Sequence, residues 1–329
     1  MGRIYYDEIT IAKGIAIVLA VLGHSFPDAV KNFCIAGTDS FASFLFDWIY
    51  SFHMYIFFVC AGFLLLPKLR TLHNIKEQIQ RRIKRLLIPY FVFSFVYYLL
   101  KLFLSSFADH PLDRHAIVLT FLGQSPCFGT WFLWTLFMIS ITCIILRKIK
   151  MMGLLIFSIG ILFLSSYITY PLFLSRISNY MIWFVLGGIL ATTYDKFYLI
   201  KYKTILAGSL FLLSLLMCHY GAVNLFVYLF RHLIGISFVW LISFVVTNQT
   251  KWLKNILMFL GDFCMDIYML SMFILVPLRI LYLNFGLLDY IPYWIFVFSS
   301  SILGIIIPCI LSKFIVRKNK ILKMLLIGA

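Results

Sequence analysis

Two ionisable side chains lie within the first apolar stretch of the sequence, which reads KGIAIVLAVLGHS from Lys13. His24 follows Lys13 by just over three helical turns, so both side chains lie near one helix face, about 16 Å apart along the axis. A cation at one end can hold the anionic head of a thin substrate, and an imidazole at the other can accept a proton or an acyl group. Two structural alternatives stay open: Lys13 reaches lipid headgroups, and His24 caps a polar contact between helices.

Three further segments carry side chains suited to such chemistry. His53, in SFHMYIFF, is either a site residue or an interfacial hydrogen-bonding group. Arg82 and Arg85 are three residues apart on one helix face, and arginine forks suit phosphate, although contact with lipid headgroups explains them equally. Trp131 opens GTWFLWTLF, where an interfacial aromatic belt is the alternative to a place in a site.

Later apolar runs contain Arg231, His232 and Arg279. An arginine at membrane depth needs a partner or a water-filled cavity, so these three residues are candidates for a groove that binds an acceptor substrate. Asp262 and Asp266 share a face at the inner start of a later run, where carboxylates favour a helix N-terminus. We interpret that acidic pair as structural.

Several familiar site motifs are absent from the sequence. It contains no Walker loop, no Rossmann glycine fingerprint, no zinc-binding pattern and no GxSxG elbow. We therefore expect histidine-assisted chemistry on a soluble donor, without a metal. The seven cysteines form no CxxC pair, and a disulfide between Cys34 and Cys127, both in outer loops, is left open.

The composition requires a membrane around these residues. Of the 329 residues, 63% are hydrophobic and only 12% are charged, whereas soluble domains have about 45–50% apolar and about 25% charged residues. Aromatic residues make up 19%, and Tyr and Trp often stand at the ends of apolar runs, as interfacial belts require. The sequence predicts an all-α, polytopic integral membrane helix bundle of about ten transmembrane helices. The predicted spans are 9–27, 48–66, 86–107, 131–146, 152–172, 180–194, 204–220, 225–247, 259–283 and 292–312.

The basic residues define the predicted orientation. When loops are assigned to alternate sides, most of the 28 Lys and Arg residues fall on one side. The positive-inside rule makes that side cytoplasmic and places both termini there. The net charge of +16 is therefore a signal of topology and of contact with anionic lipid headgroups, and we expect no nucleic-acid partner.

The chain is predicted to form a single transmembrane domain, residues 1–329, without linkers or internal repeats. The first apolar run lacks a small-residue cleavage site, so we expect it to be a retained helix. Residues 67–88 are expected to form a basic amphipathic helix on the cytoplasmic surface, ending at Pro89, where the third span opens or kinks.

Together these segments resemble the membrane-bound acyltransferase-three family, especially its branch of fucose 4-O-acetylase-like O-acetyltransferases. The family pattern of Arg or Lys, ten residues, then His falls on Lys13 and His24. The resemblance covers the first 140 residues best, and beyond them it consists mainly of the number of helices. The matching stretches are AKGIAIVLAVLGHSFP (12–27), IYSFHMYIFFVCAGFLL (49–65), RRIKRLLIPYFVFS (81–94) and WFLWTLF (131–137).

The resemblance implies an acetyltransferase that uses acetyl-CoA from the cytoplasm and a sugar hydroxyl of a cell-surface or lipid-linked glycan. His24 would be the catalytic base or would carry the acetyl group transiently. Lys13, Arg82 and Arg85 would hold the phosphates of the donor, and His53 and Trp131 would shape the region around the thioester. Direct transfer and an acyl-histidine intermediate both stay open, as do acetyl, succinyl and longer acyl groups.

Two departures from the family pattern concern the substrate. Tyr55 stands where many relatives have a proline, and Ser271 stands where they often have a histidine. The implied location is the plasma membrane of a bacterium, beside glycan-synthesis machinery. The alternative function is transport or export of a glycan or lipid-linked saccharide, which predicts internal repeats or paired broken helices.

Overall fold

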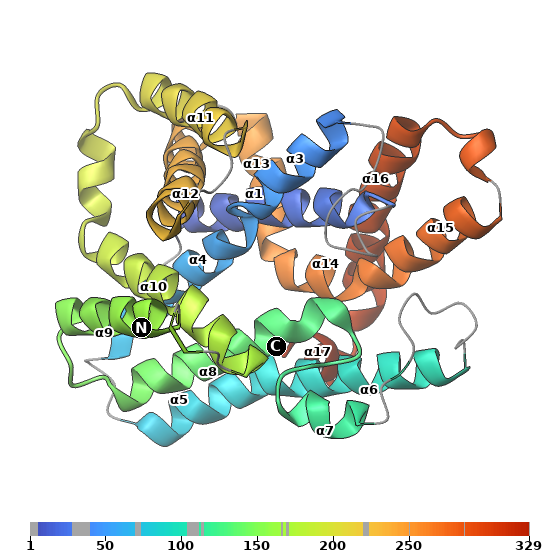
Figure 1. Ribbon diagram of the computed structural model, residues 1–329, viewed down its shortest axis with the longest axis horizontal. Coiled ribbons are helices and arrows are strands. Elements are labelled where there is room, and N and C mark those ends of the chain that lie inside the picture. Colours follow the sequence, from blue (N-terminus) through green and yellow to red (C-terminus); the bar gives the residue numbers. More distant parts are fainter. Residues whose placement is uncertain are drawn as a thin grey trace. The chain divides into compact units, whose positions relative to one another are not determined.

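The computed structural model describes residues 6–27, 40–69, 74–103, 112, 115–165, 167–168, 171–219, 224–249, 251–285 and 287–328. Every regular element within those ranges is a helix (Figure 1). The predicted all-α class is therefore confirmed. The helices form two compact units, which are taken in turn.

Unit 1 comprises Met1–Phe57 and Thr193–Cys309. Its centre is α1, whose Ile17, Ala20 and Val21 pack with Ile267 and Leu275 in a buried apolar cluster. The helices of this unit are α1 (Asp7–Ser25), α3 (Ser40–Tyr50), the start of α4 (His53–Leu69), η4 (Tyr194–Leu199), α11 (Lys203–His219), α12 (Leu225–Gln249), α13 (Lys251–Asp262), α14 (Cys264–Leu270), α15 (Met272–Asn284), η5 (Leu287–Asp289) and most of α16 (Tyr293–Leu311).

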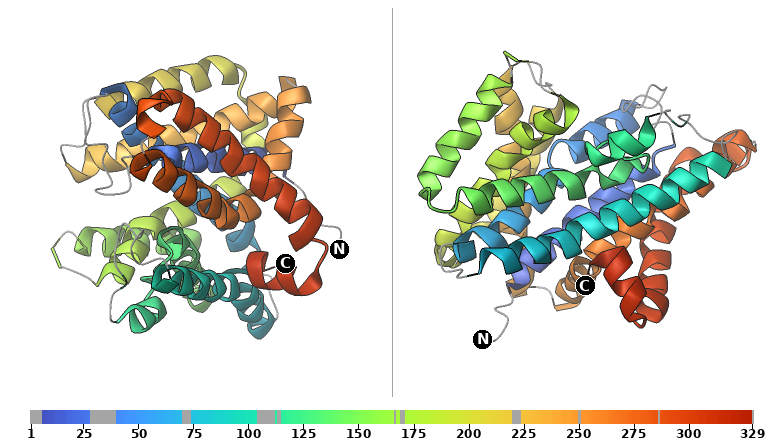
Figure 2. Two further views of the ribbon diagram at one scale, coloured as in Figure 1. Left: turned by 90° about the vertical axis from the view of Figure 1, so that its right-hand side faces the viewer. Right: turned by 90° about the horizontal axis from the view of Figure 1, so that it is seen from below.

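Unit 2 comprises Phe58–Thr192 and Ile310–Ala329. Its last helix, α17, lies beside α6 (Figure 2). Two helices, α4 and α16, have residues in both units. The division into units therefore does not decide whether the chain is a single domain, and the single domain stays a prediction. The helices of unit 2 are the rest of α4, α5 (Ile75–Arg82), η1 (Ile83–Leu87), α6 (Ile88–Phe103), α7 (Ala116–Phe121), η3 (Phe128–Thr130), α8 (Trp131–Ile145), α9 (Met151–Leu164), α10 (Leu172–Thr192), the end of α16, η6 (Ser312–Val316) and α17 (Lys320–Ile327).

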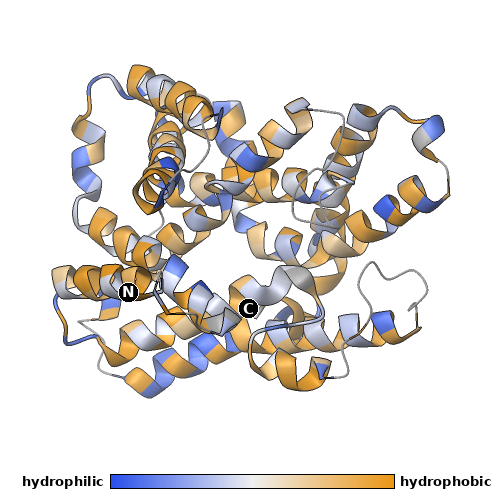
Figure 3. Cartoon of the chain, viewed as in Figure 1, coloured by the Kyte–Doolittle hydropathy of each residue, from blue (hydrophilic) through white to orange (hydrophobic). Residues whose placement is uncertain are grey.

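Seven helical stretches among the described residues are long and apolar enough to cross a membrane, and three of the other predicted spans form shorter apolar helices of 10–17 residues. Exposed apolar side chains agree with a lipid environment: α9 buries Leu154 and Leu162 but exposes Met152, Ile156 and Phe163. Figure 3 shows apolar turns along α9 and hydrophilic turns on α5. The chain is thus a polytopic membrane helix bundle.

Two predicted boundaries were wrong. Residues 75–103 form one continuous helical stretch, not a surface helix that ends where a span begins at Pro89. A π-helical turn, η1, precedes Pro89, and the Ile88 N–H bonds to the Ile83 carbonyl, so the wider turn accommodates the missing proline N–H without ending the helix. The predicted span 259–283 is instead interrupted around Phe263 and Ser271, and its apolar stretch begins at Cys264.

Glycines allow α1 to approach α13 closely. A Cβ on Gly14 would overlap the backbone carbonyl of Leu257, and a Cβ on Gly261 would overlap that of Thr10. Both obstacles are backbone atoms, which cannot rotate away as a side chain can. The two helices therefore pack backbone to backbone, as small residues permit in membrane proteins.

Gly14→Ala should lower the stability of unit 1, because the added methyl group must push α1 from α13. Overpacking of this kind costs about 1–3 kcal/mol, against a gain in helix propensity of about 1 kcal/mol. Thermal unfolding of the purified protein in detergent measures the net change. Gly208→Ala in α11 is the control, since nothing lies within 4 Å of the added Cβ; equal melting temperatures for the two variants would contradict the close packing.

Candidate functional site

Two histidines predicted from separate motifs lie together in unit 1. His24 is in the last turn of α1, and His53 begins α4. Tyr50, at the end of α3, joins them: its hydroxyl lies 3.4 Å from His24 Nδ1, and its ring packs edge-on against the ring of His53, with centroids 4.8 Å apart. Tyr50 and His53 are three residues apart across the short break between α3 and α4, in a stretch, Ser40–Leu69, that is long and apolar enough to span a membrane. We call these three residues the histidine cluster.

The hydrogen bonds of the histidine cluster distinguish its two imidazoles. His53 Nδ1 lies 2.8 Å from the Ile49 carbonyl, which can only accept, so Nδ1 carries the proton and Nε2 is a lone pair. That Nε2 is buried and has no hydrogen-bond partner among the described residues. The Tyr50 hydroxyl can either donate or accept, so it leaves both tautomers of His24 open. His24 is partly exposed, whereas His53 is buried.

Arg279 adds positive charge beside the histidine cluster. It lies on α15, is 5% exposed, and is close enough to His24 for its charge to act on the imidazole. A guanidinium at this position can stabilise negative charge that develops on a reacting oxygen. The histidine cluster and Arg279 therefore offer three groups. These are the partly exposed imidazole of His24, the acceptor nitrogen Nε2 of His53 and the guanidinium of Arg279.

Lys13 lies on the same helix as His24, nearer its start. Its charge acts on the thiol of Cys264, and so do the carboxylates of Asp262 and Asp266. Asp266 is buried in the first turn of α14, while Asp262 is exposed at the end of α13. The acidic pair thus belongs to two helices, contrary to the shared face predicted for one span.

His232 forms a second polar cluster in unit 1, with Tyr55 and Tyr228. The Tyr55 ring stacks on His232 at 4.2 Å, the Tyr228 ring meets it edge-on at 4.0 Å, and the two tyrosine hydroxyls lie 2.9 Å apart. His232 Nδ1 bonds to the Ser51 carbonyl. Tyr55, at a position where the family pattern has a proline, is therefore part of this cluster.

The predicted acceptor groove divides into separate surroundings within unit 1. Arg279 lies by the histidine cluster, His232 lies in the tyrosine cluster, and Arg231 is partly exposed near the carboxylate of Asp47. The sequence grouped these residues as ionisable side chains in apolar runs but could not assign each to its neighbours.

Trp131 lies in unit 2, at the start of α8. Its ring packs against Tyr180 at 5.1 Å, and the Arg176 guanidinium lies 5.2 Å from the ring centroid. Arg176 also donates to the Gly123 carbonyl at 3.3 Å. Such a cation over an indole is a stabilised arrangement, and it gives Trp131 defined neighbours that a purely interfacial belt residue does not need.

Arg82 and Arg85 also lie in unit 2, but they do not share one environment. Arg82 is partly buried, and its Nε has no hydrogen-bond partner among the residues described. Arg85 lies in the π-helical turn η1 and is exposed. A π turn holds more residues than an α turn, and the two side chains differ in burial, while the charge of Arg85 still acts on Arg82.

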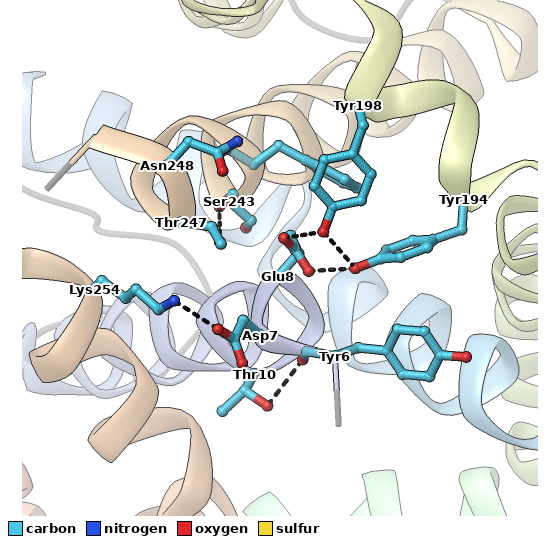
Figure 4. Close-up of polar contacts among 11 residues, drawn as sticks. Tyr6, Asp7, Glu8, Thr10, Tyr194, Tyr198, Ser243, Thr247, Asn248 and Lys254 are labelled. Atoms are coloured by element: carbon cyan, nitrogen blue, oxygen red, sulfur yellow. Dashed lines mark hydrogen bonds and ion pairs between the residues drawn. The ribbon is translucent and has the colours of Figure 1, made fainter. Parts of the chain in front are cut away.

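Sequence analysis missed a polar cluster at the start of α1 (Figure 4). Glu8 is 2% exposed and accepts hydrogen bonds from the hydroxyls of Tyr194 and Tyr198 in η4. Beside it, Asp7 pairs with Lys254 of α13 at 2.6 Å. The only sequence signals were acidic residues in a first helical turn and two tyrosines four apart.

The disulfide between Cys34 and Cys127 stays an open prediction, because Cys34 lies outside the described residues. Cys127 is a buried, free thiol. Burial, the largest cause, raises its pKa to about 12. A thiol in this state is a poor nucleophile, so Cys127 is not suited to covalent chemistry.

A family model described as an acyltransferase domain matches residues 6–313. The chain belongs to the acyltransferase-three family. No curated protein and no solved structure matches it. The protein is thus a multi-pass membrane acyltransferase, and family membership gives no support to the alternative of a transporter. The matched range of the acyltransferase-three domain includes every predicted site residue, whereas α17 follows it.

Tyr194→Phe should destabilise this acyltransferase, because the buried Glu8 carboxylate loses one of its two hydroxyl donors. We expect a loss of about 1 kcal/mol near pH 8. Burial, and secondly the bond to Glu8, raise the pKa of Tyr194 above its ordinary value. That contribution is fully present below the ordinary tyrosine pKa of about 10 and is lost as the pH rises further.

The loss of unfolding free energy in Tyr194→Phe relative to the wild type should therefore shrink above about pH 10. Chemical unfolding at a series of pH values measures it. Tyr290→Phe is the control, since that side chain is 84% exposed. A deficit that stays constant with pH, or equals that of the control, would show that the hydroxyl of Tyr194 does not stabilise the fold.

Proposed function

We propose that this protein is an O-acetyltransferase that moves an acetyl group from cytoplasmic acetyl-CoA to a sugar hydroxyl of a cell-surface or lipid-linked glycan. The observation that carries the proposal is the histidine cluster, whose His24 lies on the same helix as Lys13. A partly exposed imidazole with a buried histidine, a tyrosine and an arginine around it is suited to acyl transfer. Family membership supports the reaction class, and the donor and acceptor follow from the resemblance of the motifs.

The proposed binding of acetyl-CoA relies on basic residues that can hold its phosphate groups. Lys13 is proposed to bind them at the start of α1, and Arg82 and Arg85 in unit 2 are proposed for the same chemical task. Between residues 75 and 103 the sole acidic residue is Glu77, and it pairs with Arg81. The basic surplus that remains there suits an anion with several phosphate groups.

The transfer itself requires one proton acceptor. In the direct reaction His24 takes the proton of the sugar hydroxyl, the oxygen forms a bond to the thioester carbonyl carbon, and the carbon–sulfur bond breaks. CoA leaves as a thiolate and recovers a proton. In the alternative, His24 first takes the acetyl group and then passes it to the hydroxyl. Arg279 is proposed to stabilise the negative carbonyl oxygen in either case.

The acceptor is proposed to meet polar and aromatic side chains on the outer side. Arg231 is partly exposed and is proposed to bind hydroxyl groups of the acceptor, and buried His232 is proposed to act through the tyrosines packed on it. Tyr55, through its contacts with His232, is a candidate for setting acceptor choice. The proposed setting is a bacterial plasma membrane, next to glycan-synthesis machinery.

His24→Ala should abolish transfer, with a loss of at least about 100-fold, as expected for removal of a general base or nucleophile. The measurement is labelled acetyl transferred from acetyl-CoA to extractable glycan in membranes that contain the protein. His219→Ala is the matched control, because His219 is an exposed histidine at the end of α11. Equal labelling by both variants at equal protein level would refute the catalytic assignment.

His53→Asn separates the structural role of His53 from its chemical role. The Asn amide can still donate to the Ile49 carbonyl, but it does not replace the Nε2 lone pair. We expect folding to persist and transfer to fall about 100-fold, at the low end of general-base effects. The assay is the same labelling experiment, with thermal unfolding as the check on folding; full activity in a folded variant would show that Nε2 has no part in the reaction.

A further inference from the structure

Helix α17 ends against the basic π-helical turn of unit 2. Its last residue, Ile327, is followed by Gly328 in the left-handed conformation, with φ of 63°. A Cβ on Gly328 would overlap the Cα of Arg85 and would lie 2.6 Å from the carbonyl oxygen of Lys84. The end of α17 therefore contacts the backbone of the turn that carries Lys84 and Arg85.

Pro89 removes one backbone donor close to this contact. The Ile88 N–H bonds to the carbonyl five residues before it, that of Ile83. The next donor in that register would be residue 89, which is proline and has no N–H. The carbonyl of Lys84 therefore has no donor in the π register, and Gly328, whose own N–H bonds to the Met324 carbonyl, lies beside it.

The remaining contacts fix α17 in place. The Asn319 side chain accepts from the N–H groups of Ile321 and Leu322 at 2.9 and 3.2 Å, which caps the start of the helix. The Gly328 N–H bonds to the Met324 carbonyl at 3.1 Å, which closes the end. Along its length α17 packs against α6 and η1, and Ile327 is buried.

The electrostatics of the contact favour the basic turn. The carbonyl end of a helix carries partial negative charge, and cations are stabilised near it. The charges of Arg81 and Arg85 both act on Arg82 and repel it. The side chains of Lys84 and Arg85 are exposed.

We propose that α17 and Gly328 form a positioning clamp that holds the turn with Lys84 and Arg85 in the geometry that binds the phosphates of the acyl donor. The inference rests on the proposed use of acetyl-CoA. It assigns a role in donor affinity to a segment that follows the range matched by the family model. Gly328 is a positioning residue and does not itself contact the donor.

The test is Gly328→Ala in the full-length protein, reconstituted in lipid nanodiscs. The added methyl group must displace the end of α17 from Arg85 and Lys84. We expect the KM for acetyl-CoA and the Kd for CoA to rise about 5- to 10-fold, since the phosphate contacts loosen by roughly 1–1.4 kcal/mol. The kcat should stay within a factor of about two, because the reacting groups are untouched.

Two further variants sharpen the result. Gly160→Ala, in α9 of the same unit, has nothing within 4 Å of its added Cβ and should leave KM and Kd unchanged. In Gly328→Asn the asparagine can adopt the left-handed backbone conformation but still carries a Cβ. This variant should therefore weaken CoA binding as much as Gly328→Ala does. If asparagine restores wild-type affinity, backbone strain and not close contact is the cause, and the clamp is refuted.

Other outcomes also decide the matter. An unchanged KM and Kd in Gly328→Ala, or a lower kcat and melting temperature with KM unchanged, overturns the clamp while acetyl-CoA remains the donor. If the wild-type protein binds no CoA, the proposed donor fails and the clamp fails with it. Direct CoA binding therefore separates failure of this inference from failure of the proposed function.

Discussion

The close packing of α1 on α13 is the contact on which the proposed chemistry depends. Gly14 and Gly261 let the two backbones meet, each glycine facing a carbonyl of the other helix. α1 also contacts α3, α12, α14 and α15, so it is held from several sides. A helix held in this way has little freedom to rotate or slide. Its polar side chains therefore keep fixed depths and directions, which a site built on one helix requires.

A helix packed on several sides buries some of its polar side chains, and these need partners within the protein. Glu8 is buried and receives two tyrosine hydroxyls, which replace the water it loses. Asp7 is paired with Lys254, while His24 at the other end is partly exposed. The start of the helix is thus electrostatically satisfied by protein, and the end keeps an imidazole that a substrate can approach. The polar residues at the start of α1 therefore stabilise the fold, whereas His24 at its end remains available for a reaction.

The sequence predicted the fold class, the positions of most spans and the two histidines that lie together, because apolar length and buried ionisable groups are local signals. It did not predict the continuity of residues 75–103, since Pro89 normally ends a helix and a π turn leaves no pattern in the sequence. Tyr50 and Glu8 were missed for another reason. The partners of Glu8, and His24 as a partner of Tyr50, are distant in sequence, and a tyrosine near a span end is expected from the interfacial belt alone.

The π turn before Pro89 also changes what the arginines can do. On a regular helix Arg82 and Arg85 would lie near one face and would have similar surroundings. The wider turn directs Arg82 into partly buried surroundings and leaves Arg85 exposed. A partly buried guanidinium has a fixed direction, whereas an exposed one can follow a mobile ligand. A donor with several phosphates benefits from both properties, because one fixed contact lowers the entropy cost of binding and one adaptable contact tolerates variation in its path. The residue that seemed to break the helix is therefore the one that gives its basic segment two different binding groups.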